Sequence, residues 1–98
     1  MGISFGRNTG NRSYTYSAEL AEKLKRKGGA NSTGGAHLLS AMRRGGDKQD
    51  LCPEEAEQAA RSLREAAGRL RGKDREIAEQ IAADAQAAAD SGTTWRIG

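Results

Sequence analysis

Residues 51–98 read LCPEEAEQAARSLREAAGRLRGKDREIAEQIAADAQAAADSGTTWRIG and predict two alanine-rich amphipathic helices joined by a short link. Pro53 indicates where the first helix begins, because proline is preferred at the first helical position, and Glu54 and Glu55 suit the positive end of a helix. Glu55 can also bind back to the amide of Cys52 as half of a capping box. A link this short forces the two helices to run antiparallel. The sequence therefore predicts a helical hairpin.

Large apolar side chains are scarce on these two helices. Alanine recurs at three- and four-residue spacing along one face of each, which is the pattern of a buried stripe. The large residues on the two stripes are Leu63, Leu70, Ile77 and Ile81, and we expect them at the centre of the core. Alanine buries little apolar area, so the predicted core is thin. We therefore expect a second copy of the chain to cover part of it in a homodimer.

Both ends of the chain alternate apolar and polar residues, as strands do. Residues 2–5 and 13–16 predict a hairpin, and residues 94–97 predict a strand that carries the one tryptophan of the chain. The turn-rich residues 6–12 lack the ending of a phosphate-binding P-loop, so we interpret them as the hairpin loop. We expect the C-terminal strand to join the N-terminal hairpin in one small sheet behind the helices.

Two shorter helices are predicted between the hairpin and the alanine-rich pair. Ser17 is a good N-cap for a helix that ends near Lys27, and Thr33 is a good N-cap for one that ends at Arg44. Residues 28–35, GGANSTGG, have the composition of a flexible glycine-rich loop.

These elements give an α+β fold that is mainly helical, in the order β-β-α-α-α-α-β. The antiparallel helical hairpin and the two shorter helices form its body, and the small sheet completes it. The chain has 98 residues, which suffices for a single small domain over 1–98.

Basic residues are concentrated in the first half of the chain. Residues 1–50 carry nine Lys or Arg against four Asp or Glu, and residues 51–98 carry seven against nine. The basic clusters consist of Lys23, Lys25, Arg26, Lys27, Arg43 and Arg44. Both lie where predicted helices end, and cations stabilise the C-terminal ends of helices. Such clusters also meet phosphate, but helix-turn-helix and aromatic RNA-binding motifs are missing from the sequence. Nucleic-acid binding at these residues is therefore our second hypothesis, and we expect no sequence-specific recognition.

The sequence offers no recognisable catalytic, metal or cofactor site. With one cysteine, Cys52, and one histidine, His37, the chain cannot build a Cys/His zinc site by itself. A catalytic His37 would need a partner, and no Ser/Asp or Cys arrangement near it in the sequence supplies one. Cys52 stands where Ser or Thr usually caps a helix, so we interpret it as a cap. We predict that the protein is not an enzyme and that it binds no cofactor.

The composition also bears on location. A lone cysteine forms no intrachain disulfide and fits a reducing compartment. No apolar run approaches the length of a membrane span, and the first residues lack the features of a signal peptide. We expect a cytoplasmic protein with no membrane partner.

Short motifs are spread over most of the chain except its glycine-rich middle. They are Met1-Gly2-Ile3-Ser4, Ser13-Tyr14, Leu20-Ala21-Glu22, Pro53-Glu54-Glu55-Ala56, Leu63-Arg64-Glu65-Ala66-Ala67 and Gly92-Thr93-Thr94-Trp95 after an alanine run. With them the chain resembles a family of small uncharacterised actinobacterial proteins that is also found in phages. The resemblance implies an intracellular single domain in a Streptomyces-like or phage setting, and it carries no activity for any residue.

The hypothesis that fits these observations best is a small non-enzymatic protein-binding or regulatory module with exposed aromatic residues. Its protein partner is not identified by the sequence. Nucleic-acid binding ranks second and enzymatic activity last.

Overall fold

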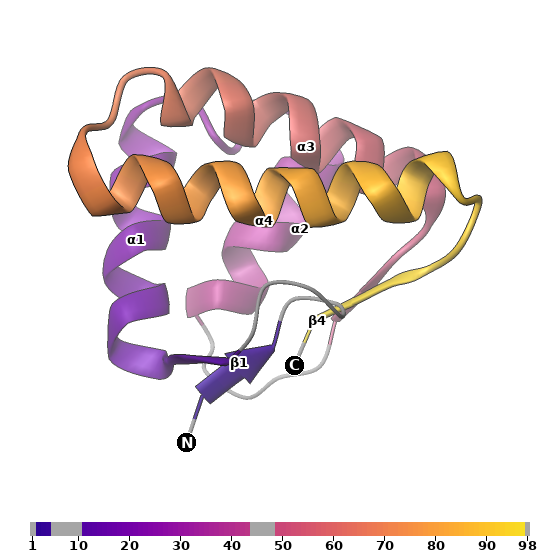
Figure 1. Ribbon diagram of the computed structural model, residues 1–98, viewed down its shortest axis with the longest axis horizontal. Coiled ribbons are helices and arrows are strands. Elements are labelled where there is room, and N and C mark those ends of the chain that lie inside the picture. Colours follow the sequence, from indigo (N-terminus) through magenta and orange to yellow (C-terminus); the bar gives the residue numbers. More distant parts are fainter. Residues whose placement is uncertain (1, 5–10, 44–48, 98) are drawn as a thin grey trace.

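The computed structural model describes residues 2–4, 11–43 and 49–97 (Figure 1). It is mainly helical, with two short antiparallel strand pairs, which agrees with the predicted α+β class. The elements in chain order are β1 (Gly2–Ser4), β2 (Asn11–Ser13), α1 (Tyr14–Arg26), α2 (Thr33–Arg43), β3 (Gln49–Leu51), α3 (Pro53–Ala67), α4 (Gly72–Asp90) and β4 (Trp95–Ile97).

The four helices form two antiparallel pairs. Helices α3 and α4 lie side by side, as the alanine-rich sequence predicts, and α1 and α2 form a second pair that crosses the first steeply (Figure 1). The core lies where the two pairs meet. Its fully buried large side chains come from every helix and from strands β3 and β4, and include Leu20, Leu24, Leu38, Met42, Leu51, Leu63, Ile81, Trp95 and Ile97.

The C-terminal strand has a different partner from the one predicted. β4 pairs antiparallel with β3, with Leu51 opposite Trp95, whereas β1 pairs with β2. The expectation of one sheet shared by both chain ends is therefore wrong. The sequence analysis missed β3 because the strand has only three residues, of which only Leu51 is buried, so no alternation is visible.

Helix boundaries also differ from the prediction at several places. Tyr14 begins α1, so the predicted strand over 13–16 ends at Ser13, and the predicted cap Ser17 is buried inside the helix. Between the alanine-rich helices, α3 ends at Ala67 and α4 begins at Gly72, so the link between them is short, as predicted.

Trp95 anchors the C-terminal strand in the core. Its side chain is only 2% exposed, and its indole Nε1–H donates to the carboxylate of Asp84 on α4, which is itself buried. A buried polar group is stable when its hydrogen bond is made, so this pair fixes β4 against α4. The general expectation of exposed aromatic residues therefore does not hold for Trp95.

The first turn of α2 lies against the backbone of α3. A Cβ atom on Gly34 would overlap the carbonyl oxygen of Glu55, so only glycine permits this approach. The Gly34 amide also donates to Oε1 of Gln58 on α3 at 3.0 Å. A Cβ on Gly35 would overlap the carbonyl oxygen of Gly29 in the preceding loop. The two glycines therefore set how closely α2 approaches its neighbours.

Ser32 caps this helix, whereas the sequence analysis assigned the cap to Thr33. The Gly35 amide donates to Ser32 Oγ at 3.1 Å, and Ser32 Oγ lies 2.8 Å from Ser62 Oγ on α3. The predicted glycine-rich loop over 28–35 thus contains the first turn of α2, and its flexibility stays a prediction.

The four large residues expected at the core centre are all buried, though not equally. Leu63 and Ile81 are fully buried, whereas Leu70 and Ile77 are 9% and 8% exposed at the edge. We predict that Leu63→Ala lowers the free energy of unfolding by about 2–5 kcal/mol, because it leaves a cavity between the helix pairs. Leu70→Ala should cost less. Urea denaturation of both variants checks this, and equal losses would contradict the placement.

A pair of glycine substitutions tests the approach of α2 to α3. Gly34→Ala forces its new methyl group into the α3 backbone, so we expect a loss of roughly 1–3 kcal/mol or more. Gly68 has a helical φ of −60° and nothing closer than 3.5 Å to an added Cβ. Gly68→Ala should therefore stabilise the protein by about 0.4–1 kcal/mol. Thermal melts distinguish the two, and a harmless Gly34→Ala would contradict the close approach.

Candidate functional site

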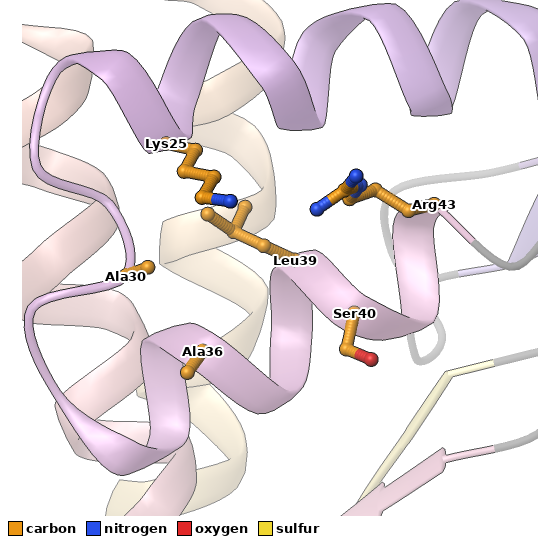
Figure 2. A pocket seen from close by; sticks show the side chains of 6 residues that line it. All are labelled: Lys25, Ala30, Ala36, Leu39, Ser40 and Arg43. Carbon is orange, nitrogen blue, oxygen red and sulfur yellow. The ribbon is translucent and has the colours of Figure 1, made fainter.

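A groove of about 550 Å³ runs between α1 and α2. Six residues line it: Lys25 on α1, Ala30 in the connecting loop, and Ala36, Leu39, Ser40 and Arg43 on α2 (Figure 2). We call it the α1–α2 groove. Its volume falls within the range of ligand-binding clefts.

The lining combines an apolar floor with two cations. Figure 2 shows Lys25 and Arg43 pointing into the space between the two helices, with Leu39 between them. Ala30 and Ala36 add small apolar surfaces, and Ser40 adds a hydroxyl. A segment that carries an apolar side chain beside a carboxylate matches this chemistry.

The two cations differ in what holds them. Arg43 Nη2 lies 3.0 Å from Glu22 Oε1 on α1, and both side chains are nearly half exposed. An ion pair this exposed contributes little free energy, so an incoming carboxylate can compete with Glu22. In the described part of the chain no carboxylate pairs with Lys25, which is exposed. The groove therefore presents positive charge to solvent.

The structure divides the predicted basic surface in two. Successive residues of a helix are 100° apart, which places Glu22 and Lys25 on the flank of α1 that faces the groove and Lys23 on the opposite flank. Lys23 Nζ there pairs with Oδ2 of Asp74 on α4 at 2.7 Å. The predicted residue Arg44 lies outside the described residues. Arg43 is thus close to Lys25 but does not share a surface with Lys23.

Asp74 joins α4 to α1 through two side chains. Besides Lys23, the hydroxyl of Tyr16 donates to Oδ1 of Asp74 at 3.0 Å. The hydrogen bond from Lys23 lowers the pKa of Asp74, with Tyr16 adding to the effect, and the same bond raises the pKa of Lys23. This contact holds α1 and the beginning of α4 together at one end of the molecule.

A second cluster lies where α2 meets the beginning of α3. His37 Nδ1 is 2.6 Å from Glu55 Oε2, and the Cys52 thiol donates to Glu55 Oε1 at 3.3 Å. The Cys52 amide also donates to Oε1 at 3.4 Å, which confirms the predicted capping contact. Hydrogen bonds from Cys52 and then from His37 lower the pKa of Glu55. Sequence reasoning missed the histidine contact because α2 packing brings together residues that are 18 positions apart.

This cluster joins two helices, and its geometry does not match a cysteine nucleophile with its base. In that arrangement the imidazole contacts the thiol directly. Here the carboxylate of Glu55 lies between His37 and Cys52 and bonds to both. Within the described ranges, no group of three or more His, Cys, Asp or Glu residues is placed to hold a metal ion.

Comparison with known proteins places the chain in an uncharacterised family. Residues 5–98 match the model of DUF7739, a domain of unknown function, and the chain belongs to that family. No curated protein and no solved structure matches it. Among the described helices, none is long and apolar enough to cross a membrane.

The lowered pKa of Glu55 predicts a pH dependence of stability. A carboxylate whose pKa is lowered in the folded state stabilises the protein above its ordinary value of 4.5, and this contribution is lost as pH falls through the folded value. Glu55→Gln should therefore lower the free energy of unfolding by about 1 kcal/mol or less near neutral pH, since the side chain is 26% exposed.

Urea midpoints measured as a function of pH check this effect. The difference between the Glu55→Gln variant and the unmodified protein should shrink at acid pH, where both side chains are neutral. Glu57→Gln is the matched control, because among the described residues Glu57 pairs with the exposed Arg61 on the same helix. A pH-independent difference for Glu55→Gln would contradict the proposed role of its charge.

Proposed function

We propose that the protein is a small non-enzymatic protein-binding module and that a partner segment docks in the α1–α2 groove. The observation that carries the proposal is the apolar floor at Leu39 between two side-chain cations. The occupant we infer is a protein segment with one apolar side chain flanked by carboxylates.

Charge and shape both support this occupant. An apolar side chain gains free energy by leaving water over Leu39, Ala30 and Ala36. Carboxylates beside that apolar side chain pair with Lys25 directly and displace the Glu22 carboxylate from its ion pair with Arg43. Complementary charge of this kind speeds association and selects the partner more than it adds affinity. The groove therefore favours acidic segments over basic ones.

The remaining parts of the proposal rest on composition and resemblance. We also propose a cytoplasmic location, for which the lone cysteine is the support, and an actinobacterial or phage setting, for which the sequence motifs are the support. A non-enzymatic role is supported by the Cys52 thiol, which bonds to the carboxylate of Glu55 and not to the imidazole of His37. Self-association stays a prediction.

A peptide titration followed by amide chemical shifts tests the groove. The probe is a blocked peptide with one leucine between glutamates, and its counterpart has lysines in place of the glutamates. We expect the acidic peptide to shift the amides of Ala36, Leu39 and Ser40, and the lysine peptide to have little effect. Lys25→Glu should weaken binding about tenfold, which is about 1.4 kcal/mol.

Two controls separate the groove from general charge and from folding. Arg61→Glu makes the same charge change on the exposed surface of α3 and should leave binding almost unchanged. Ala36→Tyr fills the groove without a charge change and should abolish binding, whereas Ala83→Tyr on the exposed surface of α4 should not. Equal effects of the paired variants, or equal binding of both peptides, would refute the proposal.

A further inference from the structure

Basic residues that are far apart in the sequence gather at one end of the molecule. The end of α1 lies beside the link between α3 and α4 (Figure 1). We define the cationic end by Lys23, Arg26, Lys27, Arg69, Arg71 and Lys73, all of which are exposed. Half of these residues come from the acidic half of the sequence, where no basic surface was expected.

Two contacts hold the cationic end together. Lys23 pairs with Asp74 in the first turn of α4. Arg69 Nη1 donates to the main-chain oxygen of Lys27 at 2.7 Å. Glu65 lies four residues before Arg69, a spacing that allows an ion pair within a helix. Among the described residues, however, Arg69 does not pair with Glu65 and bonds to the end of α1 instead. The basic residues of both segments therefore form one surface.

The charge at this end is opposite in sign to that of the rest of the chain. The six basic residues of the cationic end and Asp74 together have a net charge of +5, whereas the whole chain has a net charge of +3. The remainder of the chain therefore has a net charge of −2. A dipolar distribution of this kind orients the molecule toward a polyanion.

Helix stability does not account for all of these cations. Lys25 and Arg26 lie in the last turn of α1, where the helix dipole favours positive charge. Arg71 is the N-cap of α4, and Lys73 lies in its first turn, where the dipole disfavours positive charge. The one acidic residue in that turn, Asp74, is already paired with Lys23. In the part of the chain that the structure describes, Arg71 and Lys73 form no ion pair.

We propose that the cationic end binds the phosphate backbone of double-stranded DNA without reading its bases. Duplex DNA carries one negative charge per about 1.7 Å of its axis, which offers several phosphates to this surface at once. This function is independent of the α1–α2 groove, because Lys25 lies on the other flank of α1 and Arg43 lies on α2.

The described aromatic side chains favour a duplex over a single strand. Proteins that bind single strands stack bases on exposed aromatic rings. Trp95 is buried in the core, and the Tyr16 hydroxyl donates to Asp74. Of the aromatic side chains that the structure describes, Trp95 is inaccessible to bases and Tyr16 is half-buried beside Asp74, so the phosphate backbone is the part of the nucleic acid that this surface fits.

Fluorescence anisotropy with the full chain tests the proposal. The probes are two labelled DNA duplexes of unrelated sequence, a single strand and a poly-glutamate peptide. We expect both duplexes to bind with the same affinity, and binding to weaken steeply between about 50 and 200 mM salt as counterions are released. Stronger binding of the peptide would assign the surface to an acidic protein, and no duplex binding at low salt would refute the proposal.

Charge-matched variants locate the surface. The slope of log K against log salt concentration becomes shallower by about 0.9 for every phosphate that a side chain no longer neutralises, so Arg71→Gln with Lys73→Gln should reduce it by about 2. Arg61→Gln with Arg96→Gln removes the same charge from exposed positions outside the cationic end and should change the slope little. Circular dichroism confirms folding of each variant. An equal reduction in both double variants would show attraction to net charge alone and overturn the assignment.

Discussion

The contact between the first turn of α2 and the backbone of α3 is the constraint on which the rest of the structure depends. Gly34 allows the two backbones to approach closely, and Gln58 and Ser62 of α3 bind polar groups of that turn and its cap. Because α2 is antiparallel to α1, this contact also determines where α1 lies. The end of α1 then meets the α3–α4 link, and both proposed binding surfaces follow from one close approach of two helices.

The two flanks of α1 explain why a single basic cluster in the sequence serves two surfaces. The 100° separation of successive residues directs Lys25 toward α2 and Lys23 toward α4. Each neighbour supplies a different environment. Helix α2 adds Leu39 and Arg43, which make a groove with an apolar floor, whereas the beginning of α4 adds Arg71 and Lys73, which extend the charge. The first combination suits a protein segment, and the second suits phosphate.

Local signals in the sequence predicted the local structure well. The cap at Cys52 and the antiparallel pairing of α3 and α4 both follow from residues close together in the chain. Apart from the misplaced caps at Ser17 and Thr33, the main errors concern contacts over longer separations. The pairing of β3 with β4 joins residues more than 40 positions apart. Gly34 lies in a helix that packs closely against Glu55, whereas the glycine-rich composition of its segment indicates a loop. Composition also could not show that the Asp84 carboxylate allows Trp95 to be buried.

The large side chains that β3 and β4 add to the core change what the shortage of large residues on the helices implies. The alanine stripes suggested a core too thin to be stable without a second copy of the chain. In the structure Leu51, Trp95 and Ile97 close one end of that core, so β3 and β4 supply large side chains that the helices lack. The argument for self-association from a thin core therefore loses force. The surfaces that remain for partners are defined mainly by charge, and screening by salt should weaken binding at both of them.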